Sequence, residues 1–246
     1  MTATNQADRP AGGGVVLGVL GASGGVGAST LATACAVRAS AARRDVVLVD
    51  AHPWGGGLDV LAGLDAEPGL RWTDLQGIRG DVDPHRLVGE LPATDEGLRC
   101  VSWGVQPPEG DPPGPRPVLT AVRAAVELTV VDLPRPAAPV LGHQQWWAMC
   151  DEVVLLVEAS VVGLGAAATV SRAVHGLSGV VLRWPSVLPE EDIASALGAP
   201  VLARLAEDRT VRSCLERGRA VASESGPLTD AADEVLCVLL PGLRAA

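Results

Sequence analysis

The residues whose types and order could do chemistry begin with a glycine-rich turn, ASGGVGAST, at residues 22–30. In such a turn the backbone N–H groups, together with the positive end of a following helix, form a binding site for phosphate. Two acidic residues, Asp50 and Asp132, each end a later apolar run, in VVLVD and in LTVVD. Because parallel strands present their carboxyl ends at one edge of a sheet, we expect both carboxylates to lie beside the turn.

The turn fits two kinds of nucleotide site. Aligned as G-x-x-x-G-x-G from Gly21, it resembles the cofactor turn of short-chain dehydrogenases, with Asp50 as the acid that binds ribose. Enzymes of that class need a Tyr-x-x-x-Lys pair for proton transfer, and the chain contains neither tyrosine nor lysine. On this interpretation the chain is a dinucleotide-binding module without chemistry.

Aligned as a phosphate-binding loop, the turn matches G-x-x-x-x-G-K-[ST] at Gly27 and Ser29, with Ala22 at the first glycine and Ala28 at the lysine. Such a site needs acids that hold water and magnesium beside the phosphates. We therefore predict Asp50 as the catalytic acid, and Ser29 and Asp132 as magnesium ligands. The predicted nucleotide-binding residues of the loop are Gly24, Gly25, Val26, Gly27, Ala28, Ser29 and Thr30.

Composition limits the other classes of function. With 29 acidic and 19 basic residues the net charge is −10, which disfavours non-specific nucleic-acid binding. The five cysteines are scattered without metal-ligand spacing, which is typical of small buried residues in a reducing compartment. No apolar run reaches the ~18 residues of a membrane span. We expect a soluble cytoplasmic protein with a flexible tail over residues 1–13.

The elements that must position these residues are short β-branched runs that alternate with alanine-rich segments. This alternation predicts one α/β domain over residues 14–246, a mostly parallel, doubly wound sheet with helices on both faces. The expected strands cover residues 15–20, 45–50, 98–103, 128–132, 152–158, 180–183 and 201–205. The expected helices cover residues 29–40, 117–127, 137–149, 162–177, 190–197, 210–217 and 228–240.

The chain resembles the MinD/ParA group of deviant P-loop ATPases in four stretches: GASGGVGASTLA, VVLVDAHPWGGGLDVLAGL, GLRWTDL and LTVVDLP. Within that group it is most similar to the CpaE/TadZ branch, which includes the actinobacterial septum-site-determining and secretion/helicase-neighbourhood CpaE-like proteins. The resemblance runs from about Val15 to the C-terminal helix. Its most specific matches come before Pro134.

The resemblance implies a spatial-organiser or assembly protein that uses ATP with Mg²⁺. It implies a homodimer in which the loops of two subunits face each other. The implied partners are a Tad-like secretion or pilus ATPase, or cell-division proteins, and no sequence-specific nucleic acid. The implied location is cytoplasmic, with peripheral placement at the membrane, pole or septum through those partners.

The resemblance also shows which family residues are missing. The family's two loop lysines fall on Ser23 and Ala28, and the second acid of its D-x-D pair falls on His52. An adenine-contacting asparagine falls on Leu182, so we expect the next residue, Arg183, to contact the base. In the late loop, Asp208 is the corresponding candidate. Segment 52–59 would be the first switch segment of the family.

Without a lysine, the loop loses charge-assisted hydrogen bonds of about 1.5–3 kcal/mol each. We therefore expect a pseudo-ATPase that binds ATP weakly or not at all and turns over little. An alternative is a slow ATPase in which an arginine supplies the missing charge, and Arg135, Arg209 and Arg212 are the candidates. A second alternative is a turn kept only for close packing of strand and helix.

Overall fold

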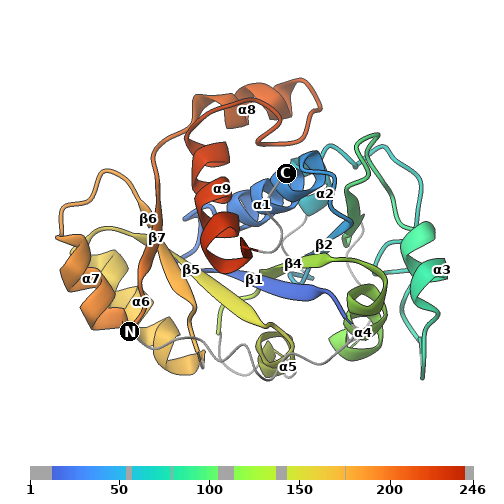
Figure 1. The fold of residues 1–246 in the computed structure, drawn as a ribbon, viewed down its shortest axis with the longest axis horizontal. Coiled ribbons are helices and arrows are strands. Elements are labelled where there is room, and N and C mark those ends of the chain that lie inside the picture. Colours follow the sequence, from blue (N-terminus) through green and yellow to red (C-terminus); the bar gives the residue numbers. More distant parts are fainter. Residues whose placement is uncertain are drawn as a thin grey trace.

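A seven-stranded parallel sheet forms the centre of the protein (Figure 1). The structure is a computed structural model that describes residues 13–53, 57–78, 80–104, 114–136, 143–174 and 176–241. The strand order is β3-β2-β4-β1-β5-β6-β7, and every pairing between these strands is parallel. The strands are β1 (Val15–Gly21), β2 (Val46–Asp50), β3 (Arg99–Val101), β4 (Leu128–Leu133), β5 (Glu152–Glu158), β6 (Gly179–Arg183) and β7 (Val201–Leu205).

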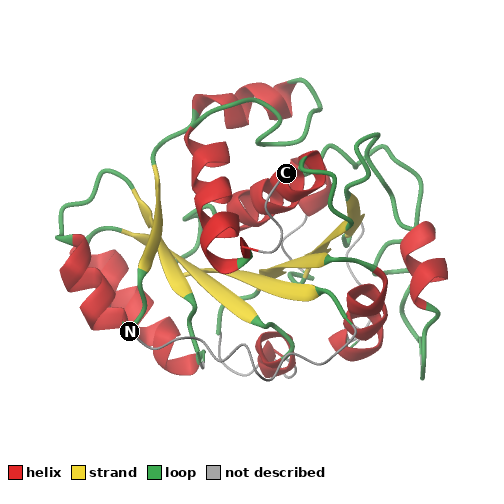
Figure 2. Ribbon diagram, viewed as in Figure 1, coloured by secondary structure: helices red, strands yellow, loops and turns green. Residues whose placement is uncertain are grey.

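The central strands are continuous runs of valine and leucine because both of their faces are covered. Residues Val46–Asp50 of β2 and Leu128–Leu133 of β4 are buried at every position. Such runs are typical of parallel strands between two helical layers. Helices cover both faces of the sheet, as Figure 2 shows in red around the yellow strands.

Two clusters of buried apolar side chains, one on each face of the sheet, hold the layers together. On one face lie α1 (Ala28–Ala41), α2 (Leu58–Leu61), α8 (Arg209–Glu216) and α9 (Pro227–Leu239). The other face carries α3 (Pro84–Gly89), α4 (Pro115–Ala125), α5 (His143–Ala148), α6 (Val161–Ala173) and α7 (Glu190–Leu197). In Figure 1, α1 and α9 lie above the sheet, and α4 and α5 lie below it.

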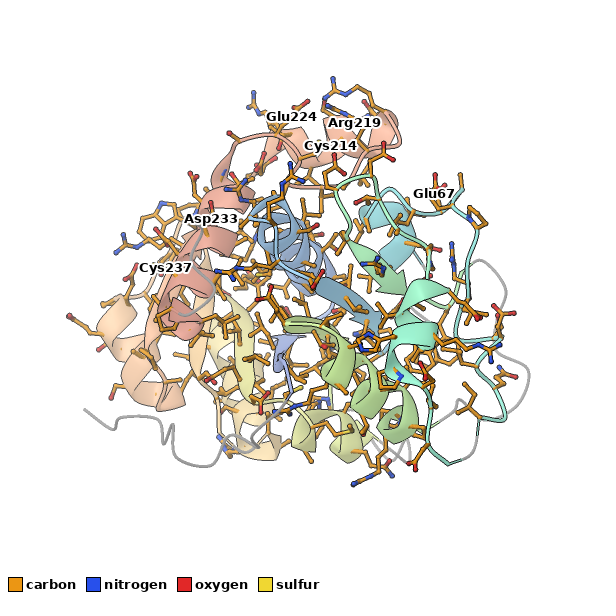
Figure 3. The ribbon with its side chains drawn as sticks, turned by 45° about the vertical axis from the view of Figure 1, so that its right-hand side comes forward. Glu67, Cys214, Arg219, Glu224, Asp233 and Cys237 are labelled. Atoms are coloured by element: carbon orange, nitrogen blue, oxygen red, sulfur yellow. The ribbon has the colours of Figure 1, made fainter. Side chains whose placement is uncertain are left out.

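Ion pairs join side chains on the surface around α8 and α9, where Figure 3 labels Glu224, Arg219 and Asp233. Arg38 of α1 and Asp233 of α9 form a salt bridge of 2.8 Å, and Glu224 pairs with Arg217 and Arg219 beyond the end of α8. Exposed pairs of this kind contribute little to stability. Contact between α1 and α9 rests instead on buried side chains such as Leu31 and Val235.

The topology creates a crevice at the carboxyl end of β1. Strands β4 and β5 flank β1. The helix that follows β1 (α1) covers one face of the sheet, whereas the helix that follows β4 (α5) covers the other. Loops that leave neighbouring strands toward opposite faces open a crevice between them, which is where sheets of this type bind ligands.

The predicted α/β class and parallel sheet are confirmed, and all seven expected strands are present. Strands β5 and β7 and helix α7 begin and end at the predicted residues. Two short helices, α2 and α3, were not predicted. The helix expected over residues 137–149 is described only from His143 to Ala148, and most of the expected tail lies outside the described residues. Across the part of the chain that is described, no helix is both long and apolar enough to cross a lipid bilayer.

Candidate functional site

The glycine turn joins β1 to α1 in a conformation that requires glycine at two positions. Gly25 has φ 73° and Gly27 has φ 103°, both in the left-handed region that side-chain-bearing residues rarely adopt. Gly27 is the N-cap of α1 and provides no capping side chain. The first N–H groups of α1 therefore have no side-chain acceptor, and they are the groups with which a helix start binds phosphate.

The turn encloses a pocket of about 310 Å³ at the carboxyl end of β1. All seven loop residues predicted to bind nucleotide, from Gly24 to Thr30, line this pocket. Gly21 and Ser23 also line it, and its remaining walls come from outside the turn: His52, Leu133 and Arg135. The pocket is thus built from the ends of β1, β2 and β4 and the start of α1.

The two acids lie side by side in the sheet and next to His52, which lines this pocket. Asp50 and Asp132 are direct partners in the β2–β4 register, and each residue is 2% exposed. Asp50 Oδ1 accepts a 2.8 Å hydrogen bond from the backbone N–H of His52. Asp132 Oδ1 is buried with no hydrogen-bond partner among the described residues. One buried carboxylate oxygen is therefore available to a proton or a cation.

Burial dominates the acid–base properties of both carboxyls. It raises the pKa of Asp50 to about 8; the His52 N–H opposes this rise, and the charges of Asp132 and Asp59 add to it. Burial also raises the pKa of Asp132, against the influence of His52 and the Ser29 hydroxyl. Two adjacent buried carboxyls are costly when both are charged, so a bound cation would favour their charged forms.

The donors at this place fit magnesium as part of a complex with phosphate. Hydroxyl and carboxylate oxygens are the ligands that Mg²⁺ prefers, and Ser29 and Asp132 supply one of each. The described residues contain no group of three or more His, Cys, Asp or Glu side chains that could hold a metal by themselves. Mg²⁺ at this site would accordingly need water and phosphate oxygens as further ligands.

Two side chains that carry or can carry positive charge stand at the pocket wall. His52 Nε2 is 2.9 Å from the backbone oxygen of Leu133 and 3.9 Å from Asp132 Oδ1. Arg135 faces the turn: a Cβ atom built on Gly24 would lie 3.5 Å from Arg135 Nη2. The other two arginine candidates, Arg209 and Arg212, belong to α8 and do not line the pocket. Arg212 pairs with Glu216 at 2.8 Å.

The structure does not bring Arg183 and Asp208 to the pocket wall. Arg183 is half-buried at the carboxyl end of β6, which β5 separates from β1. Asp208 caps α8 by accepting bonds from the N–H and hydroxyl of Thr210, at 2.8 and 2.7 Å, and it accepts a 2.9 Å bond from Leu228 N–H at α9. Although burial acts to raise the pKa of Asp208, these bonds outweigh it and the pKa is lowered. The nucleotide contacts of Arg183 and Asp208 stay predictions.

The position of Asp50 argues against a dinucleotide site. An acid that binds ribose must present its carboxylate to the ligand, whereas Asp50 is buried and its Oδ1 accepts the backbone N–H of His52. Neither acid lines the pocket, but Asp132 Oδ1 is 3.9 Å from Nε2 of the pocket-lining His52. The predicted switch segment is described at residues 52–53 and 57–59, and Trp54 lies outside the described residues.

A cluster of three tryptophans supports the acids and was not predicted. Trp72 Nε1 donates a 2.7 Å hydrogen bond to the backbone oxygen of Asp50. Its ring stacks on Trp103 at 5.6 Å and meets the edge of Trp146 at 5.8 Å. The adjacent Trp147 donates from Nε1 to the backbone oxygen of Pro134 at 3.4 Å. Nothing in residue spacing indicates this packing, because the three rings come from distant segments.

Comparison with known proteins identifies relatives by sequence and by structure. No model of a known protein family matches the chain. Two sequences described as uncharacterized proteins, Rv3660c and MT3760 from two Mycobacterium tuberculosis strains, are each 33% identical over 231 residues, or 92% of this chain. The chain spans 64% of the length of these relatives.

Several solved structures have a similar fold. A ParA family ATPase from Chlorobium tepidum has a TM-score of 0.72 at 19% identity, covering 92% of this chain and 99% of that one. A MinC:MinD cell division complex from Aquifex aeolicus gives 0.72 at 19% identity, with 92% and 96% covered. MinD with Mg-ADP from Pyrococcus horikoshii gives 0.63 at 17%, with 90% and 93% covered. The chain therefore has the MinD/ParA P-loop NTPase fold.

Proposed function

We propose that the chain is a spatial-organiser or assembly protein of the CpaE/TadZ or septum-site type, and that its turn binds ATP with Mg²⁺. One observation in particular supports a nucleotide site at the turn. The left-handed turn and the uncapped start of α1 form one pocket of about 310 Å³, and the buried Asp132 Oδ1, which has no hydrogen-bond partner among the described residues, lies 3.9 Å from Nε2 of the pocket-lining His52. Phosphate would bind the loop amides, and Ser29 and Asp132 would hold Mg²⁺.

A role in placing other proteins within the cell is supported by the names of proteins that share this fold. Among them are a cell division protein in complex with MinC and a septum site-determining protein with Mg-ADP. By this analogy the partners of the chain are cell-division proteins or a Tad-like pilus or secretion ATPase. The CpaE/TadZ assignment rests on the four stretches of sequence resemblance.

Affinity and turnover are proposed to be low because the loop itself carries no cation. Each missing charge-assisted bond costs about 1.5–3 kcal/mol, which is about ten- to a hundredfold in affinity. Charge that develops on the phosphate oxygens during hydrolysis would also lack a fixed cation from the loop. A slow ATPase is the alternative, and the position of Arg135 at the pocket wall favours it. Phosphate-release assays with ATP and Mg²⁺ distinguish the two.

Replacing Ser29 with alanine is expected to weaken binding of a fluorescent ATP analogue about tenfold when Mg²⁺ is present. The hydroxyl is the proposed metal ligand, so the difference should largely disappear in EDTA. The matched control is Ser195→Ala, on the exposed side of α7, which should bind like the wild type. Failure of the wild type to bind below millimolar concentrations would leave the turn as a packing feature alone.

A homodimer through the carboxyl edge of the sheet is also proposed. Four exposed apolar side chains stand at this edge: Val161, Val162, Trp184 and Val187. The β6–α7 and β5–α6 segments that carry them are joined by a 3.1 Å bond from Val187 N–H to the backbone oxygen of Ala159. A second copy that faces the loop pocket would cover them.

We expect Val162→Asp to abolish dimer formation in ATP and Mg²⁺, because it places a charge where an 82%-exposed valine would be buried. The control is Val238→Asp, which changes a 56%-exposed valine on α9. Light scattering gives the mass of each variant with and without ATP. A dimer that persists in Val162→Asp would show that another surface joins the subunits.

A further inference from the structure

We propose that Arg135 supplies to the bound phosphates the positive charge that the loop lacks. This inference rests on the proposed nucleotide site and adds to it a cation from outside the loop. The guanidinium would bind phosphate oxygens at the Gly24 side of the pocket, and its ligand is the polyphosphate of ATP. Three features of the structure support it: Arg135 lies at the pocket, its guanidinium has no partner among the described residues, and the backbone before it is held in place.

Arg135 lies at the wall of the loop pocket. Among the arginines of the described residues, Arg135 is the one that lines the loop pocket. Its Nη2 and Cζ atoms would be 3.5 and 3.9 Å from a Cβ built on Gly24, so the guanidinium lies over the backbone of the turn. Gly24 is next to Ser23, the position of one missing lysine. The pocket therefore has a cation beside the place where the loop sequence has none.

The guanidinium of Arg135 is available to a ligand. Many arginines of this chain are committed to acids: Arg38 to Asp233, Arg123 to Asp151, and Arg204 to Glu190. Arg135 is exposed and forms no salt bridge or hydrogen bond within the described residues. A free guanidinium facing a phosphate-type turn keeps all of its N–H donors for a ligand. It can bind a phosphate group with two of them at once, which an ammonium cannot match in geometry.

The backbone next to Arg135 is anchored, and an exposed arginine side chain is most effective when it extends from a fixed backbone. The two residues before Arg135 are held by their backbone oxygens. That of Leu133 contacts His52 Nε2 at 2.9 Å, and that of Pro134 accepts a 3.4 Å bond from Trp147 Nε1. Leu133 itself ends β4, next to β1 in the sheet. The side chain of Arg135 therefore extends from a backbone that contacts with His52 and Trp147 hold in place.

The test first compares ATP binding in three variants, each titrated with a fluorescent ATP analogue and Mg²⁺, with ATP and AMP as competitors. Arg135→Ala is expected to weaken ATP binding about ten- to a hundredfold. Arg135→Lys should recover part of it, and Arg209→Ala on α8 should change it less than twofold. Since AMP lacks the β- and γ-phosphates, Arg135→Ala should weaken AMP competition much less than ATP competition.

The decisive variant returns the charge to the loop. Adding Ala28→Lys to Arg135→Ala should restore ATP binding to the wild-type range, because Ala28 is the lysine position of the loop. A melting temperature within a few degrees of wild type confirms that each variant is folded. If Ser29→Ala weakens ATP binding but Arg135→Ala leaves it within twofold, the role of Arg135 is wrong and the nucleotide site stands. If the wild type binds no ATP below millimolar concentrations, both are wrong.

Discussion

Replacing Asp50 with asparagine is expected to stabilise the protein strongly at pH 8 and to change its stability little near pH 4. Burial raises the pKa of Asp50 from 3.8 to about 8 in the folded protein. Between these two values the folded state holds a proton that the unfolded state has lost. The free energy of unfolding of the wild type should therefore fall as pH rises, by at most about 1.4 kcal/mol per pH unit from this group.

Urea unfolding at intervals from pH 4.5 to pH 8.5 measures this dependence. Asp50→Asn should have a flatter profile, because the amide oxygen can still accept the bond from His52 N–H and carries no charge. The control is Asp95→Asn, at an exposed turn, which should follow the wild type. Parallel profiles for wild type and Asp50→Asn would mean that the Asp50 carboxyl is not held in a buried, proton-binding state.

Replacing Trp72 with alanine is expected to lower the free energy of unfolding by about 3–5 kcal/mol. The ring is fully buried, it contacts both Trp103 and Trp146, and its N–H bonds the backbone oxygen of Asp50. The substitution would leave a cavity and remove the partner of a buried carbonyl next to the site. Binding of ATP should weaken as well, because this carbonyl belongs to the end of β2.

Thermal and urea unfolding test this expectation against Trp184→Ala. Trp184 is 43% exposed and lies under the guanidinium of Arg204, with Cζ 5.5 Å from the ring centroid. Its removal should cost about 1 kcal/mol or less. Equal losses at the two positions would contradict a structural role for the tryptophan cluster.

The fold was largely predictable because the strand signals are local. Strands buried on both faces appear as unbroken valine and leucine runs, and the elements β5 and β7 have the predicted bounds. Helices α2 and α3 were missed because four and six residues are too short to show a helical repeat. For α3 a signal was present: Asp83 followed by Pro84 is a helix start, and Asp83 does accept the bond from Arg86 N–H.

The centre of the site was predictable for a similar reason. Residues 24–30 are contiguous, and Asp50 and Asp132 lie at or next to the last residue of strands whose carboxyl ends the parallel arrangement brings together. The placement of the other candidate residues depends on how distant segments pack against one another, which no local sequence pattern encodes. Three arginines were equivalent candidates in sequence, and the sheet order places Arg135 at the pocket. The bonds of Asp208 to Thr210 and Leu228, which tie α8 to α9, also depend on tertiary packing, and its contact with a nucleotide stays a prediction.

The most direct test of the nucleotide site is a crystal structure of the protein grown with Mg²⁺ and a non-hydrolysable ATP analogue. We expect the phosphates on the amides of residues 24–30, Mg²⁺ between Ser29 and Asp132, and the Arg135 guanidinium on a phosphate oxygen. A structure in which saturating analogue leaves the turn empty, or binds with its phosphates elsewhere, would contradict it.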